Sequence, residues 1–239
     1  MRLLLASGGL RTPERVQHLH DAVRAHFGDV QRVLFIPYAM HDPDQYVAML
    51  VGRGLHAGYA IDGIHRHSDP VHAVRQADAI YVGGGNTFRL LHALYRFGLL
   101  DPIRERVRAG VPYLGISAGS NVAGPTIKTT NDMPIIQPPS FDALGLVPFQ
   151  INPHYYSGTH WVKSGDELLE HFSETRDDRL REFHEMNDTP VIGLWEAGLL
   201  HCDGDTVRLS VAPARVFRKG QPPVDASPGS DLTELISPR

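Results

Sequence analysis

The chain has 239 residues and a formal net charge of −4. This is long enough for one sizeable α/β domain, and it gives no electrostatic reason to expect nucleic acid or an anionic membrane as a partner. Its apolar runs are short and interrupted by charges, so the sequence predicts no transmembrane span. The single cysteine, Cys202, excludes an internal disulfide and is typical of a reducing compartment. We therefore expect a cytoplasmic protein with one domain over 1–219 and a loosely held, proline-rich tail over 220–239.

Strands and helices alternate through the first half of the chain. Short apolar segments predict strands at 3–6, 32–36, 59–64, 79–82 and 113–116. Amphipathic segments, several of which begin with an N-cap residue followed by proline, predict helices at 12–28, 42–57, 69–76, 88–98 and 101–110. This order predicts an α/β fold with a mostly parallel, doubly wound sheet and helices on both faces. Such sheets bind ligands at the carboxyl ends of their strands.

The second half of the chain is less regular. Residues 125–148 are rich in proline, threonine and asparagine, and a loop this long inside a compact domain is usually functional. Short strands are expected at 151–154 and 191–194. The charged segment 167–184 has the apolar stripe of a helix, formed by Leu168, Leu169, Phe172, Leu180 and Phe183. A C-terminal β-hairpin is expected at 199–202 and 207–211, and 214–217 completes it.

A Gly-x-Ser-x-Gly motif is centred on Ser117 and follows the apolar run 113–116. The pattern is typical of a strand that enters a tight turn and then a helix, with the serine hydroxyl exposed at the turn. An ordinary glycine-rich turn has the same pattern. The glycine-rich segment 83–86 also follows a strand, so it should lie at the same edge of the sheet as Ser117. This shared position favours a functional site.

A serine nucleophile needs a base, usually a histidine that a carboxylate orients. Of the 14 histidines, His154 is the best candidate, because it ends an apolar strand where a polar residue has no structural purpose. A hydrogen-bonded core histidine is the alternative. Two carboxylates compete to orient it: Asp132 in the long loop, and Glu196 after the strand at 191–194. Either could instead be a turn residue.

An acyl transfer also needs N–H donors for the developing oxyanion. The N–H of Ala118 follows the serine at a helix start, and Gly85 of the glycine-rich segment is the second candidate. A phosphate-binding loop is the alternative for 83–86, but the spacing matches neither nucleotide fingerprint. The sequence has no typical metal-ligand spacing, so we expect no metal.

Five segments together resemble the α-aspartyl dipeptidases of peptidase family S51, the serine peptidase family that also contains cyanophycinase. They are 83–88 (GGGNTF), 115–119 (GISAG), 129–134 (TTNDMP), 141–144 (FDAL) and 150–154 (QINPH). They occur in the family's order, between residues 83 and 154. The resemblance implies a fold like that of class I glutamine amidotransferase (flavodoxin-like) domains. It also implies hydrolysis of dipeptides with an N-terminal aspartate through an aspartyl-enzyme ester, without metal or cofactor.

The resemblance implies Ser117 as nucleophile, His154 as general base, and Gly85 and Ala118 as oxyanion donors. Both Asp132 and Glu196 match positions proposed for the third member, and Asp132 is favoured.

Asn86 and Arg176 are the candidates for substrate binding. Arg176 lies in a segment, 174–176 (ETR), that resembles a family motif, and a planar guanidinium suits a substrate carboxylate. A surface arginine paired with acids of its own helix is the alternative. The chain departs from the family pattern in a longer 155–170 segment and in Trp195 before the glutamate.

The expected partner is a small acidic dipeptide, and the chain is expected to be a monomer or a homodimer. Two other functions remain open. One is a cyanophycinase-like exopeptidase that cleaves β-aspartyl-arginine, and the other is a non-catalytic ligand-binding domain of the amidotransferase type.

Overall fold

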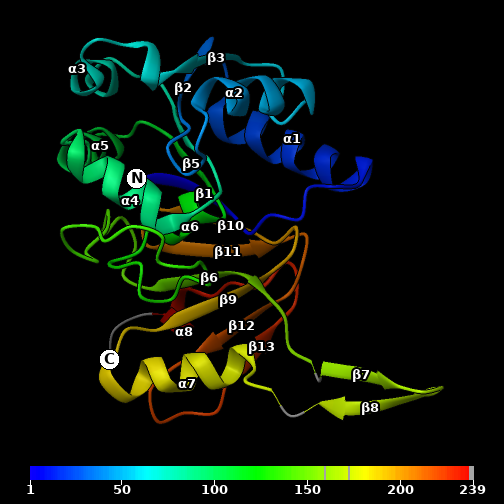
Figure 1. The fold of residues 1–239 in the computed structure, drawn as a ribbon. Helices are drawn as coiled ribbons and strands as arrows, with labels where there is room; N and C mark the ends of the chain where they lie inside the picture. Colours follow the sequence, from blue (N-terminus) through cyan, green and yellow to red (C-terminus); the bar gives the residue numbers. More distant parts are fainter. Residues whose placement is uncertain (159, 172, 237–239) are drawn as a thin grey trace.

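The computed structural model describes residues 1–158, 160–171 and 173–236. A seven-stranded sheet forms its centre (Figure 1). Five strands are parallel, and two antiparallel strands extend the sheet at one edge. In spatial order the strands are β11 (Thr206–Ser210), β10 (Leu199–Asp203), β1 (Arg2–Ala6), β5 (Tyr113–Ile116), β4 (Ile80–Val82), β2 (Arg32–Ile36) and β3 (Ala60–Gly63). The expected doubly wound sheet is confirmed.

Helices cover both faces of this sheet because alternate side chains of each buried strand point to opposite sides. Leu4 of β1 belongs to the core under α1 and α2, whereas Leu3 and Leu5 belong to the core under α3, α4 and α5. The helices of the two layers are α1 (Pro13–Phe27), α2 (Pro43–Gly52), α3 (Pro70–Arg75), α4 (Thr87–Arg96) and α5 (Leu100–Arg108). A short 3-10 helix, η1 (Ile64–Arg66), follows β3.

The local signals read from the sequence set most helix starts. Thr12, Asp42 and Asp69 each accept a hydrogen bond from a backbone N–H of the first turn, with proline at the first helical position. The helix expected over 42–57 ends early, at Gly52. Glycine disfavours the helix interior, and Gly54 has a φ of +70° that a helix cannot contain.

A second sheet of four strands packs against the β10–β11 side of the first (Figure 1). Its strands are, in order, β13 (Val224–Ala226), β12 (Ala214–Phe217), β9 (Val191–Trp195) and β6 (Gln150–Tyr155). The prediction that 214–217 completes the hairpin is wrong. Val211 has a φ of +70°, and the Pro213 carbonyl accepts a hydrogen bond from Trp195, so the chain turns away from β11 and pairs with β9.

The segment expected to be one helix over 167–184 is divided. Glu167–His171 is strand β8, which pairs with β7 (His160–Ser164) in a hairpin that projects from the body (Figure 1). Helix α7 (Arg176–Met186) begins later, at a capping box between Thr175 and Asp178. Leu168 and Leu169 are therefore exposed, whereas Leu180 is buried; Phe172 lies outside the described residues.

The tail expected after Lys219 is not loosely held over its described part. Strand β13 pairs with β12, and helix α8 (Thr233–Ile236) follows it. Ala226, Leu232 and Ile236 are buried in the main core. In the described residues no helix is long and apolar enough to cross a membrane.

Candidate active site

Ser117 lies at the turn between β5 and the short helix α6 (Ala118–Asn121). Its φ of +54° and ψ of −109° are rare for a residue with a side chain, so the turn is strained. Gly115 and Gly119 must be glycines because backbone carbonyl groups lie too close to each of them for a side chain. A Cβ on Gly115 would lie 2.5 Å from the Gly119 carbonyl oxygen, and a Cβ on Gly119 would overlap the Val82 carbonyl. The motif therefore forms the strained turn that the sequence predicts.

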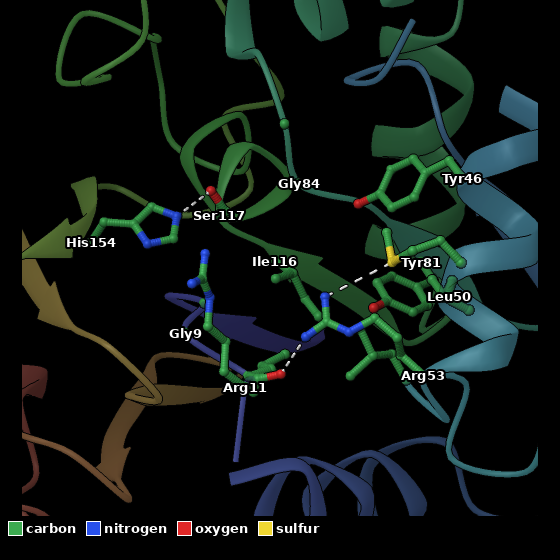
Figure 2. Close-up of a pocket in the computed structure, with 15 residues that line it drawn as sticks. Gly9, Arg11, Tyr46, Leu50, Arg53, Tyr81, Gly84, Ile116, Ser117 and His154 are labelled. Atoms are coloured by element: carbon green, nitrogen blue, oxygen red, sulfur yellow. Dashed lines mark hydrogen bonds between the residues drawn. The ribbon is translucent and has the colours of Figure 1, made fainter. Parts of the chain in front are cut away.

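His154 lies within β6, where the strand has a register shift and His154 has a φ of +55°. This bulge directs the imidazole toward Ser117, and its Nε2 lies 2.7 Å from the Ser117 Oγ (Figure 2). The backbone is held in place by Ser7 at the end of β1. The fully buried Ser7 hydroxyl accepts a hydrogen bond from the His154 N–H at 2.8 Å and donates one to the Leu194 carbonyl at 2.9 Å.

Glu196 is the carboxylate that contacts His154. It lies in the turn between β9 and β10, and its Oε1 is 2.8 Å from His154 Nδ1. With the imidazole proton on Nδ1, His154 donates to Glu196 and its Nε2 accepts from the Ser117 hydroxyl. The hydrogen bond from His154 lowers the pKa of Glu196, and the charges of Arg15 and Arg11 add to this, whereas partial burial opposes it. Glu196 is thereby kept ionised at neutral pH.

Asp132, which the sequence favours for this position, lies elsewhere. Its Oδ2 accepts hydrogen bonds from the Thr87 N–H at 2.7 Å and the Thr87 hydroxyl at 2.6 Å, and also from the Thr130 hydroxyl. Asp132 thus binds the first turn of α4, where a carboxylate is favoured by the exposed N–H groups. The structure brings Ser117, His154 and Glu196 together and separates Asp132 from them.

Gly8 and Gly9, which are not among the residues predicted for the site, also shape it. A Cβ on Gly8 would overlap the His154 ring, and a Cβ on Gly9 would lie 2.6 Å from Glu196 Oε2. Both have positive φ values, +147° and +69°. The pair His154–Glu196 therefore packs directly on bare backbone. The sequence feature that could have identified these two glycines is their position, since Ser7, Gly8 and Gly9 directly follow a predicted strand, as the 83–86 segment does.

The glycine-rich segment lies beside Ser117, as expected from the pairing of β4 with β5. A Cβ on Gly84 would lie 3.0 Å from the Ser117 Cβ, and Gly85 has a φ of +132°. Within the described part of the chain, neither Gly85 nor Ala118 donates a backbone hydrogen bond. Both N–H groups are therefore available as donors to a ligand.

Arg176 does not pair with the acids of its own helix. Its guanidinium donates to Asn131 and lies over the Tyr156 ring at 5.5 Å, while its buried Nε has no partner among the described residues. Burial lowers the pKa of Arg176. Asn131 in turn donates to the Pro153 carbonyl at 2.8 Å, beside His154. The arginine is thus linked to the strand that carries the imidazole.

Asn86 is the N-cap of α4. Its Oδ1 accepts from the Arg89 N–H at 3.0 Å, and its Nδ2 donates to the Met133 carbonyl at 2.9 Å. Its amide therefore helps Asp132 to hold the long loop at α4. A contact between Asn86 and a substrate stays a prediction.

A cavity of about 230 Å³ opens next to Ser117 and His154 on the side of α1 and α2 (Figure 2). Gly84 and Gly85 also line it. Most of the other lining residues were not predicted as site residues from the sequence.

The whole chain is similar to known peptidases. The model of peptidase family S51 matches residues 3–210. Peptidase E of Streptomyces coelicolor is 46% identical over 241 residues, covering 100% of this chain and 96% of the relative. Peptidase E of Shewanella amazonensis is 46% identical over 98% of each chain.

Solved structures show the same fold. A candidate peptidase E from Listeria monocytogenes has a TM-score of 0.63 and 25% identity, covering 87% of this chain and 97% of its own. A peptidase from an acI-B1 Actinobacterium has a TM-score of 0.66 and 18% identity, covering 96% and 95%. The expected class I glutamine amidotransferase-like fold is confirmed. The chain belongs to peptidase family S51.

Proposed function

We propose that this serine peptidase is a dipeptidase that hydrolyses Asp-X dipeptides, with Ser117, His154 and Glu196 as its catalytic triad. One observation carries the proposal: two consecutive hydrogen bonds, of 2.7 Å and 2.8 Å, link the Ser117 hydroxyl through the imidazole to the Glu196 carboxylate. This is the arrangement in which a histidine can accept a serine proton while a carboxylate stabilises the resulting imidazolium.

The reaction begins when Ser117 Oγ attacks the aspartyl carbonyl carbon and His154 Nε2 takes the hydroxyl proton. The N–H groups of Gly85 and Ala118 donate to the developing oxyanion. The imidazolium gives its proton to the leaving amine as the C–N bond breaks, which leaves an aspartyl ester on Ser117. Water then attacks the ester, gives a proton to His154, and the serine is regenerated as aspartate leaves.

We assign Arg176 as the residue that binds the side-chain carboxylate of the substrate's aspartyl residue. A half-buried guanidinium with an unpartnered Nε, held beside β6 by Asn131, suits a planar carboxylate. Asn86 is the second candidate contact, from the glycine-rich side. The single cysteine, Cys202, is free and buried, which supports the proposal of a cytoplasmic enzyme. We further propose that the enzyme acts on small peptides as a monomer or homodimer.

The proposal is tested with Asp-X, β-Asp-Arg and Gly-X dipeptides. The wild type should cleave Asp-X fastest, and Ser117→Ala should reduce kcat by about a thousandfold or more. Ser68→Ala, which removes an exposed hydroxyl between η1 and α3, is the matched control and should keep the wild-type rate. Equal rates for Ser117→Ala and Ser68→Ala would refute a serine mechanism, and faster cleavage of β-Asp-Arg would identify a cyanophycinase-like enzyme instead.

A further inference from the structure

The cavity beside Ser117 is lined by other residues than those of the proposed aspartyl site. Its walls come from the 8–11 segment, from α2 and from the ends of β4 and β5, whereas Asn86, Asn131 and Arg176 do not line it. Ser117 and His154 are among the residues that line the cavity. Large apolar and aromatic side chains line the body of the cavity: Leu10, Tyr46, Met49, Leu50, Leu55, Tyr81 and Ile116.

The charged side chains on the rest of the cavity wall are positive. Arg11 and Arg53 line it together with His154, and no aspartate or glutamate is among the described residues of the wall. Glu196, which lies near Arg11 but outside the wall, offsets only part of this positive charge, so the cavity favours an anionic ligand. Its volume of about 230 Å³ is below the roughly 300–1,000 Å³ of sites for drug-sized ligands, so one amino acid suits it.

The two arginines differ in what holds them. Arg53 donates to the Leu10 carbonyl at 2.7 Å and contacts the Met49 sulfur, so its guanidinium fixes the backbone next to Arg11. In the described part of the chain, the Arg11 guanidinium makes no hydrogen bond or salt bridge, and the charged group near it is the carboxylate of Glu196, which already pairs with His154. Figure 2 shows its side chain extending across the cavity mouth toward Ser117 and His154. Arg11 is therefore the cation that is free to bind a ligand.

A dipeptide substrate carries a carboxylate that would lie close to Arg11. When the acyl half of the substrate is bound at Ser117, the leaving half begins at the scissile nitrogen, and its α-carboxylate carbon is only two bonds away. We propose that Arg11 binds the α-carboxylate of the leaving amino acid, and that the apolar cavity behind it takes that residue's side chain. This inference rests on the proposed dipeptidase function, since it assigns the leaving-group side of the same site.

Binding to the Ser117→Ala protein tests this assignment without hydrolysis. Calorimetric titration compares Asp-Leu with Asp-Leu amide, which lacks only the terminal charge. We expect Asp-Leu to bind about 10- to 100-fold more tightly, the effect of one charge-assisted bidentate pair. This ratio should fall to about one when Arg11→Ala is added, and Arg11→Lys should restore part of it. Arg108→Ala, which removes the same charge from the exposed end of α5, is the matched control and should keep the ratio.

The outcomes separate this inference from the proposed function. If the two ligands bind equally to Ser117→Ala, if neither binds, or if Arg11→Ala keeps the ratio, Arg11 does not bind the carboxylate. None of these binding results decides whether the wild type hydrolyses Asp-Leu, which is measured separately. If the wild type fails to cleave Asp-Leu while the ratio depends on Arg11, the carboxylate site stands and the proposed hydrolysis is wrong.

Discussion

The hydroxyl of Ser7 and the backbone N–H of His154 are 2.8 Å apart, and this hydrogen bond ties the end of β1 to the bulge of β6. Because His154 has a φ of +55°, its backbone needs such support to keep the imidazole pointing at Ser117. The same hydroxyl donates to Leu194 in β9. Ser7 therefore connects three strands at the site.

Replacing Ser7 by alanine should misplace the imidazole and leave two buried backbone groups unsatisfied. We expect kcat to fall about tenfold or more and the free energy of unfolding to fall by about 1–3 kcal/mol. Steady-state kinetics and urea unfolding measure the two effects. Ser210→Ala removes a hydroxyl that bonds His201 at 2.8 Å on β11 and is the matched control. If both variants keep the wild-type kcat, the imidazole does not depend on Ser7.

Glu196→Gln should lower kcat much more than Asp132→Asn. A glutamine cannot stabilise the imidazolium as the ionised carboxylate does, so we expect a loss of about a hundredfold or more. Asp132→Asn weakens the hydrogen bonds to Thr87 and Thr130 instead, and we expect it to lower the free energy of unfolding by about 1–3 kcal/mol with less than about a tenfold effect on kcat. Kinetics of both variants with an Asp-X dipeptide decide between them. A larger loss of kcat in Asp132→Asn would restore the role that the sequence favours.

Gly8→Ala should lower kcat because the added methyl group overlaps the His154 ring. The added methyl would occupy the space of the His154 ring, so the ring must move and kcat should fall about tenfold or more. Gly204→Ala is the matched control, since Gly204 has a φ of +56° but no atom within 4 Å of an added Cβ. Both changes place a side chain at positive φ and should cost about 1 kcal/mol or more in stability. Equal kcat values in the two variants would contradict the packing of His154 on bare backbone.

His26 should make the protein sensitive to mild acid. Burial lowers its pKa from 6.5 to about 4, and its Nε2 contacts the Tyr113 carbonyl at 3.0 Å. Below pH 6.5 the unfolded chain takes up a proton that the folded protein does not take until near pH 4, so stability falls across this interval.

The His26→Gln variant should lose this part of the slope, whereas His18→Gln, which changes an exposed residue of the same helix, should keep it. Urea unfolding at several pH values between about 7 and about 4.5 measures the slopes. A His26→Gln slope equal to that of the wild type would show that His26 is not the source of the acid sensitivity.

The first half of the fold could be predicted because its signals are local. Continuous apolar strands and Pro-capped helices fix an alternating order, and that order places the carboxyl ends of the strands at one edge. The position of Ser117 beside the 83–86 segment follows from it. The tight turn at Ser117 could also be predicted, because Gly115 and Gly119, which permit it, lie within two residues of the serine.

The rest depends on contacts that the chain order does not reveal. Glu196 rather than Asp132 contacts His154 because of where β9 leaves the second sheet. No local pattern indicates that 214–217 pairs with that strand. The projecting hairpin β7–β8 resembles an amphipathic helix in its apolar spacing, although Leu168 and Leu169 remain exposed. Arg11 and the Ser7–Gly9 segment gain their roles only because β1 is the neighbour of β5.

The proposed triad spans the junction between the two sheets: Ser117 follows β5 of the first, His154 lies in β6 of the second, and Glu196 lies where the chain passes from β9 to β10. Catalytic alignment is therefore a measure of how the two sheets are docked. A small shift at their common core would misalign the proton path while each sheet stayed folded. Activity should accordingly be lost before the global structure when the inter-sheet packing is weakened.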